Sequence, residues 1–177
     1  ISTLKSDTTS RDVRIVTSLT QSKRGVFWAV SEFITAFFSP APQNVDTTKG
    51  VLILKGIWDD VIKDIVWTED TILTTYKWYV LDADRAFSIA ISHNIAFDPS
   101  GKFGWISLLG QLDGVSEDYY HPIFYHSEDS GATWQGPIQL DLMDFPSITN
   151  FIDTFSTCAF DADLTVDANG NPHFASV

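Results

Sequence analysis

One short stretch constrains the fold of this chain more than any other part of the sequence. It runs from Ser127 to Trp134 and fits the pattern S-x-D-x-G-x-T-W at every fixed position. Apolar runs flank it, at residues 123–125 before and at residues 138–140 after. The stretch is therefore expected to form a tight turn that joins two strands.

Each fixed residue of this pattern has a physical reason to be there. The Asp129 carboxylate can accept hydrogen bonds from backbone N–H groups of its own loop. Gly131 permits a backbone conformation that a Cβ would penalise. Thr133 and Trp134 begin the outgoing strand, where β-branched and aromatic residues are favoured.

The pattern resembles the Asp-box of the sialidase-like β-propellers, also called the BNR-repeat family; an unrelated hairpin turn is the alternative. The resemblance implies an all-β fold made of four-stranded antiparallel blades, with the Asp-box between the third and fourth strands and away from the active centre. The motif residues are then expected to be structural rather than catalytic: Ser127, Asp129, Gly131, Thr133 and Trp134.

A second pattern occurs twice. Residues 95–101 and 164–170 both read apolar-x-apolar-D-x-x-G, and the distance from Asp98 to Asp167 is 167 − 98 = 69 residues. A propeller blade needs ~40–50 residues, so this repeat is expected to carry a loop insertion. The sequence therefore predicts one partial β-propeller over residues 1–177, with irregular first blade(s) at 13–80, the best-defined blade at 86–141 and the start of the next at 160–177.

The remaining strand signals agree with an all-β chain. Alternation and β-branched residues predict strands over 13–19, 26–30, 33–38, 51–54, 71–80, 89–97 and 103–109, whereas 59–67 fits either a helical turn or a strand. A propeller closes with roughly four to eight blades, more than this chain holds. The chain also lacks an initiating Met and a signal segment. It is therefore expected to be a piece of a larger protein, whose remainder would be one of its partners.

Charge excludes two classes of partner. Eleven basic and 23 acidic residues give a formal net charge of −12, which repels nucleic acid and anionic membranes. The apolar run at 26–38 contains Glu32 and is too short for a membrane span.

Cys158 is expected to be buried beside Phe155 and Phe160. The resemblance and the absence of basic patches favour an extracellular or cell-surface location.

The chemistry of sialidases does not assemble in this sequence. The resemblance implies three arginines that bind the substrate carboxylate, an Asp acid/base and a Tyr nucleophile. The chain has four arginines, Arg11, Arg14, Arg24 and Arg85, and residues 86–177 contain none. We therefore expect a non-catalytic scaffold or a binding domain for a glycan or a protein partner. The alternative is a sialidase-like glycoside hydrolase with catalytic residues partly outside this segment.

Aromatic residues are the candidates for a ligand-binding surface. Trp58, Trp67 and Trp78 lie in the irregular region, whereas Trp105 and Trp134 are expected to pack between sheets. Tyr119 and Tyr120 lie in an acidic loop at 113–120 that suits sugar binding or a solvated surface.

Metal ligands are a weaker signal. An oxygen-rich run could hold Ca²⁺, although turn chemistry explains it better: Asp161, Asp163, Asp167 and Asn169. His121 and His126 are expected on opposite faces of one strand and cannot share a metal. No cofactor is expected.

Overall fold

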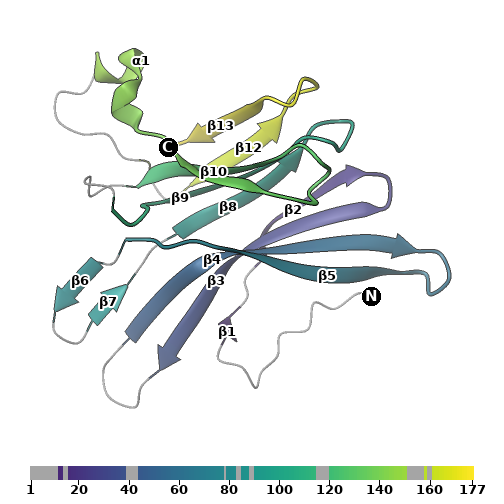
Figure 1. The fold of residues 1–177 in the computed structure, drawn as a ribbon, viewed down its shortest axis with the longest axis horizontal. Helices are drawn as coiled ribbons and strands as arrows, with labels where there is room; N and C mark the ends of the chain where they lie inside the picture. Colours follow the sequence, from purple (N-terminus) through teal and green to yellow (C-terminus); the bar gives the residue numbers. More distant parts are fainter. Residues whose placement is uncertain are drawn as a thin grey trace.

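The computed structural model of this chain describes residues 12–13, 16–38, 44–77, 79–82, 85–87, 90–114, 120–150, 158 and 161–177. The described part is all-β, with antiparallel strands and two short helical turns (Figure 1). The predicted fold class is confirmed at this level. No sheet in the described part closes into a ring, so the propeller arrangement stays a prediction.

The first sheet has its longest strands at its centre. It contains five strands: β1 (Asp12–Val13), β2 (Val16–Lys23), β3 (Val26–Phe38), β4 (Asn44–Asp59) and β5 (Asp64–Leu73). β3 pairs on one side with β1 and β2 and on the other with β4, which also pairs with β5.

The central strands are longer than the sequence pattern predicts. Residues 26–30 and 33–38 belong to one strand, because β4 pairs with β3 from Val26 to Phe38 past a single register shift after Phe33. The predicted short strand at 51–54 is the middle of β4. Residues 59–67 form a hairpin turn and the first part of β5 rather than a helix. Polar residues weaken the strand pattern in the sequence, but hydrogen bonding to a neighbouring strand keeps these residues in the strand.

The second sheet has the order β11-β10-β9-β8. Its strands are β8 (Ala90–Phe97), β9 (Gly104–Gly110), β10 (His121–Ser127) and β11 (Gln135–Gln139). The D-x-x-G turn joins β8 to β9, and the Asp-box stretch joins β10 to β11, as the sequence predicts.

The predicted strand at 71–80 is wrong as a continuous element. β5 ends at Leu73, and a separate two-stranded ribbon follows, β6 (Tyr79–Asp82) with β7 (Arg85–Phe87). Between them the chain crosses to the second sheet, where Lys77 N donates to Gln111 O at 2.9 Å and Tyr76 forms a bridge to Leu112. Contacts with another sheet therefore end a run whose composition is locally β.

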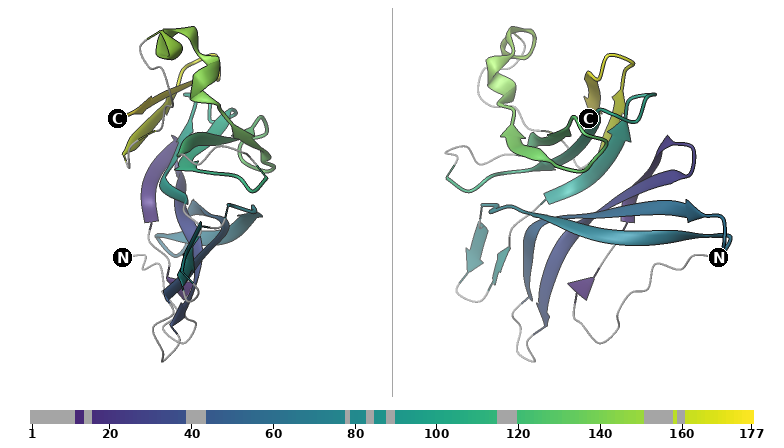
Figure 2. Two further views of the ribbon diagram at one scale, coloured as in Figure 1. Left: turned by 90° about the vertical axis from the view of Figure 1, so that its left-hand side faces the viewer. Right: turned by 45° about the vertical axis from the view of Figure 1, so that its right-hand side comes forward.

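The chain ends in a hairpin that repeats the start of the second sheet. After β11 come η1 (Leu142–Asp144) and α1 (Pro146–Thr149), which lie beyond the ends of the strands in both further views (Figure 2). β12 (Ala162–Val166) then pairs with β13 (Pro172–Ser176).

The second sheet is covered on both faces. Between it and the first sheet lies the largest buried cluster of the described residues, to which both sheets and Tyr76 contribute: Trp28, Val30, Val51, Ile53, Tyr76, Ala90, Ile95, Ile106, Leu108, Ile123 and Tyr125. On the other face, Ala96 and Phe124 pack against Leu164 and Val166 of the β12–β13 hairpin. The first sheet, the second sheet and the β12–β13 hairpin thus follow one another in chain order (Figure 1). A buried apolar cluster joins each of them to the next.

Candidate functional site

The turn at residues 127–134, which we call the Asp-box turn after the motif that its sequence resembles, is held together by the Asp129 carboxylate. This group accepts hydrogen bonds from the Thr133 N–H at 2.8 Å, the Thr133 hydroxyl at 2.6 Å and the Ser127 hydroxyl at 2.8 Å. The hydrogen bonds from Thr133, followed by that from Ser127, lower the pKa of Asp129 to about 2. A carboxylate satisfied within its own turn serves the backbone rather than a substrate.

The rest of the motif faces the core. The Trp134 ring lies edge-on to Trp28 and Phe97, at centroid distances of 6.4 and 6.1 Å. Gly131 has a φ of +74°, and the Cβ of any other residue there would overlap the Trp28 ring. The Ser130 N–H donates to the Lys102 carbonyl at 2.9 Å, which ties the Asp-box turn to the D-x-x-G turn beside it. These contacts are those of a structural element.

The two tryptophans of β4 and β5 have different surroundings. Trp58 is 43% exposed, and its Nε1 donates to Asp60 Oδ1 at 3.0 Å. Trp67 is half-buried and packs against Ala29, Leu52 and Leu54, so it belongs to the core more than to a binding surface. Sequence alone gave no reason to separate them.

The turn at Trp58 presents aliphatic side chains to solvent. Val61 is 90% exposed and Ile62 is 61% exposed. The Asp59 carboxylate accepts from the N–H groups of both, at 2.7 and 3.2 Å, which fixes the turn that carries them. The β4–β5 turn thus exposes apolar side chains next to the charged side chains of Asp60 and Lys63.

The other predicted ligand-binding residues do not join Trp58. Trp78 and Tyr119 lie outside the described residues. Tyr120 is partly buried, and burial raises the pKa of its phenol. It directly precedes β10, whose start lies at the opposite end of the sheets from the β4–β5 turn (Figure 1). The structure therefore does not bring Trp58 and Tyr120 to one site.

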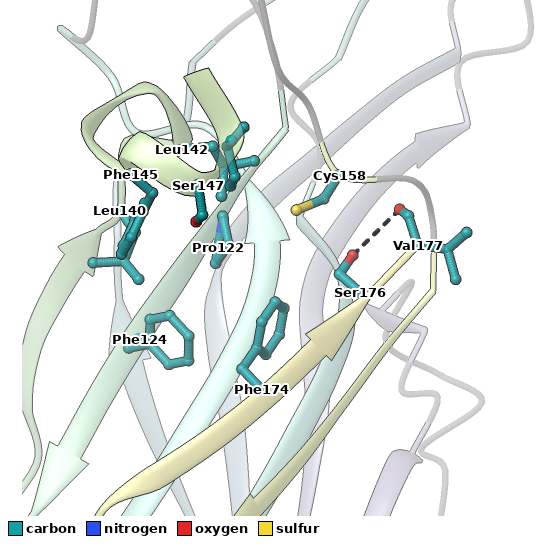
Figure 3. A pocket seen from close by; sticks show the side chains of 11 residues that line it. Pro122, Phe124, Leu140, Leu142, Phe145, Ser147, Cys158, Phe174, Ser176 and Val177 are labelled. Carbon is teal, nitrogen blue, oxygen red and sulfur yellow. Dashed lines mark hydrogen bonds between the residues drawn. The ribbon is translucent and has the colours of Figure 1, made fainter. Parts of the chain in front are cut away.

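A cavity lies between β10, the segment that follows β11 and includes the helical turns, Cys158 and β13. It has a volume of about 480 Å³, and Figure 3 shows its lining side chains: Pro122, Phe124, Leu140, Leu142, Phe145, Ser147, Ile148, Cys158, Phe174, Ser176 and Val177. We call it the β13 pocket. The Phe124 and Phe174 rings meet edge-on inside it, at a centroid distance of 5.3 Å. Its walls are predominantly apolar.

Sequence reasoning missed this pocket. Cys158 is 8% exposed, as predicted, but the residues expected beside it, Phe155 and Phe160, lie outside the described residues. The available signal was the spacing of Leu142, Phe145 and Ile148 after the Asp-box. Three-residue intervals place apolar side chains on one face of a helical segment.

The oxygen-rich run near the C-terminus builds a turn. The Asp167 carboxylate accepts from the N–H groups of Asn169 and Asn171 at 2.8 and 2.9 Å. These hydrogen bonds, led by those from Asn171, lower the pKa of Asp167. Across the described part of the chain, no group of three or more His, Cys, Asp or Glu side chains is placed to hold a metal ion.

The arginines are dispersed in the fold. Arg24 is exposed in the β2–β3 turn, and Arg85 begins β7. Arg11 and Arg14 lie outside the described residues. In the described ranges, no helix has the length and apolar composition needed to cross a membrane.

Comparisons with protein-family models, with curated proteins and with solved structures found no match to this chain.

Proposed function

We propose that this chain is a non-catalytic β-sheet scaffold of the sialidase-like propeller type, which binds a protein partner through the β13 pocket. The observation that carries this proposal is the chemistry of the pocket. Its described lining contains no charged side chain, and nine of its eleven residues are Pro, Phe, Leu, Ile, Val or Cys. Such walls suit apolar side chains of a partner, because their burial releases water from both surfaces.

The hydrolase alternative demands a different pocket. A sialoside carboxylate is best held by converging guanidinium groups, and glycoside cleavage needs a pair of carboxyl groups. The described lining of the β13 pocket has neither. Asp129 and Asp167 are engaged within their own turns. We therefore favour binding over catalysis, and we place the domain outside the cell or at its surface on the strength of the Asp-box resemblance.

A glycan is the second candidate ligand, and Trp58 is the observation that favours it. Its indole is 43% exposed, and the hydrogen bond to Asp60 fixes its orientation. An exposed, oriented aromatic ring is the kind of surface on which sugars stack. If glycans bind there, Trp58→Ala should abolish retention on a glycan array, whereas Phe145→Glu in the β13 pocket, described next, should retain it.

Selection from a random peptide library displayed on phage tests the main proposal. Phe145→Glu places a charge at the pocket rim, where the side chain is already 41% exposed, so the fold should be kept. We expect peptides rich in aliphatic and aromatic residues to bind the unmodified protein and to be lost on this variant. Glu128→Gln, on the exposed Asp-box turn, is the control.

Two results would count against this assignment. One is a failure to enrich any peptide that distinguishes the Phe145→Glu variant from the unmodified protein. The other is release of a fluorophore from a sialoside by the protein, which would establish the hydrolase instead.

A further inference from the structure

Two neighbouring hairpin turns of the first sheet form a surface that lies apart from the β13 pocket (Figure 1). Arg24 and Gly25 make the β2–β3 turn, because Lys23 pairs with Val26. The β4–β5 turn begins beside them, where the Trp58 N–H donates to the Gly25 carbonyl at 2.9 Å. The strands that enter and leave both turns belong to the described residues, so this surface lies within the chain and not at one of its ends.

The β4–β5 turn holds apolar side chains in water in fixed positions. Val61, Ile62 and Trp58 are all exposed. The Asp59 carboxylate accepts hydrogen bonds from the N–H groups of Val61 and Ile62, and the Trp58 indole donates to Asp60. A partner that covers these side chains therefore meets a preformed turn and loses little free energy in ordering it.

The β2–β3 turn adds positive charge beside these apolar residues. Lys23 and Arg24 are exposed. Gly101 of the second sheet packs against Lys23, and the next residue, Lys102, is also exposed, with its Nζ 4.4 Å from the centroid of the Phe103 ring. Within the described part of the chain, none of these three cations forms an ion pair. A chain with a net charge of −12 thus presents unpaired positive charge at this turn.

The composition of this surface favours a protein over other partners. A lipid bilayer would have to dehydrate the carboxylates of Asp59 and Asp60, which is costly. A sugar ring could stack on Trp58, but the aliphatic side chains of Val61 and Ile62 offer its hydroxyl groups no hydrogen bond. Protein interfaces combine an apolar centre with a charged rim, and Trp and Arg are enriched in them.

We propose that Lys23, Arg24, Trp58, Val61 and Ile62 form a second docking surface, which binds a protein segment with apolar residues next to acidic ones. We call it the turn surface. The apolar residues of the partner cover the β4–β5 turn, and its carboxylates lie toward the β2–β3 turn, where the cations are unpaired. This inference goes beyond the proposed function, because the turn surface and the β13 pocket share no residue.

The same phage-displayed random peptide library, selected on the full chain, tests this surface. We expect a group of peptides with aliphatic or aromatic residues next to Asp or Glu. Val61→Ser and Ile62→Ser should each lower the affinity of these peptides, made synthetically, about tenfold or more, as the loss of a central apolar contact does. Leu73→Ser is the matched control, because Leu73 is an exposed aliphatic residue at the other end of β5. It should change the affinity less than about twofold.

Charge reversal tests the orientation of the partner. Arg24→Glu should weaken the acidic peptides, and a new selection on this variant should enrich Lys or Arg where the first selection enriched Asp or Glu. Arg24→Lys keeps the charge and should keep the acidic preference. Because Arg24 is exposed in a turn, both variants should retain the fold.

Four outcomes would overturn the turn surface as a protein-docking site. The first is peptide binding that survives both serine variants. The second is an acidic preference that Arg24→Glu leaves unchanged. The third is retention of the protein on a sulfated glycan array or on phosphatidylcholine vesicles that Val61→Ser abolishes, which would assign the surface to another class of ligand. The fourth is a dimer of the free protein that Val61→Ser dissociates, which would assign it to a second copy.

The variants keep this test distinct from the proposed function. Peptides that are lost on Phe145→Glu alone would support the β13 pocket and refute the turn surface. Peptides that are lost on Val61→Ser alone would do the reverse. If no peptide is enriched, both proposals fail.

Discussion

Single carboxylates organise the turns of this chain at the scale of the residue. Asp98, Asp129 and Asp167 each accept hydrogen bonds from residues that follow within five positions. Burial acts to raise the pKa of Asp98, but hydrogen bonds from the Ser100 hydroxyl and nearby N–H groups outweigh it and lower that pKa. In all three turns, the ionised form is the one that the folded backbone stabilises.

Replacing Asp129 with Asn should lower the free energy of unfolding and reduce its dependence on pH in acid. The pKa of Asp129 falls from 3.8 to about 2 on folding, so the unfolded chain binds this proton more readily. The contribution of Asp129 is therefore complete above about pH 4 and is lost as the pH falls toward about 2. Urea unfolding at several pH values between about 2 and 5 measures the effect. Asp144→Asn, at an exposed carboxyl, is the control; equal slopes in the two variants would refute the role given to Asp129.

Gly131 and Gly114 form a matched pair for testing the packing of the Asp-box turn. Their φ angles are +74° and +81°, but an added Cβ at Gly131 would meet the Trp28 ring, whereas at Gly114 it would meet nothing within 4 Å. Alanine at either position costs about 1–2 kcal/mol for the left-handed backbone. Gly131→Ala should cost about 1–3 kcal/mol more, because it overpacks the core. Equal unfolding free energies for the two variants, measured in urea, would contradict this.

At the scale of the element, a register shift in β8 determines where His93 and Asn94 point. The pairing of β8 with β9 shifts between Ile91 and Asn94, and Ser92 has a φ of 52°. His93 is consequently turned inward and is 1% exposed, while Asn94 Nδ2 donates to the Ala162 carbonyl of β12 at 2.9 Å. The bulge thus joins two sheets and buries a titratable ring.

His93 should make stability fall between about pH 6.5 and pH 4. Burial lowers its pKa from 6.5 to about 4, so the unfolded chain takes up a proton in this range before the folded chain does. Stability is then complete above about pH 6.5 and declines by up to about 3 kcal/mol as the pH reaches about 4. His93→Gln should remove this slope in urea unfolding, and His173→Gln, at an exposed histidine, should leave it. An unchanged slope in His93→Gln would show that another group is responsible.

The sheets do not contribute equally at the scale of the whole molecule. Eleven buried residues join the first and second sheets, whereas four join the second sheet to the β12–β13 hairpin. Because free energy of burial grows with apolar area, the hairpin is held less strongly than the rest.

Hydrogen exchange should therefore show the β12–β13 amides opening before those of β9 and β10. Leu164→Ala should speed exchange in the hairpin alone, since its side chain packs only in the smaller cluster. Ile106→Ala, in the larger cluster, should speed exchange throughout by lowering global stability by about 2–5 kcal/mol. Equal protection of β12 and β9 in the unmodified protein would contradict this order.

Structural elements that are determined by residues close together in the sequence were predictable. The D-x-x-G and Asp-box turns, the strands that they join and the packing of Trp134 follow from residues within a few positions of each other. The burial of Trp67 and the length of β4 could not be predicted from the sequence, because each depends on a strand that is distant along the chain. The sequence pattern at 71–80 was misleading for the same reason. Tyr76 forms a bridge to Leu112 and Lys77 donates a hydrogen bond to Gln111, and these distant contacts end the strand.

The sequence by itself determined the β class, the two repeated hairpin turns and the turn at residues 127–134, because short-range hydrogen bonds and backbone preferences select them. Only the tertiary structure decided which faces are covered, where His93 lies and that a pocket opens beside β13. Those features arise where residues far apart in the chain meet. Their position depends on how the sheets pack, and local sequence carries little information about that packing.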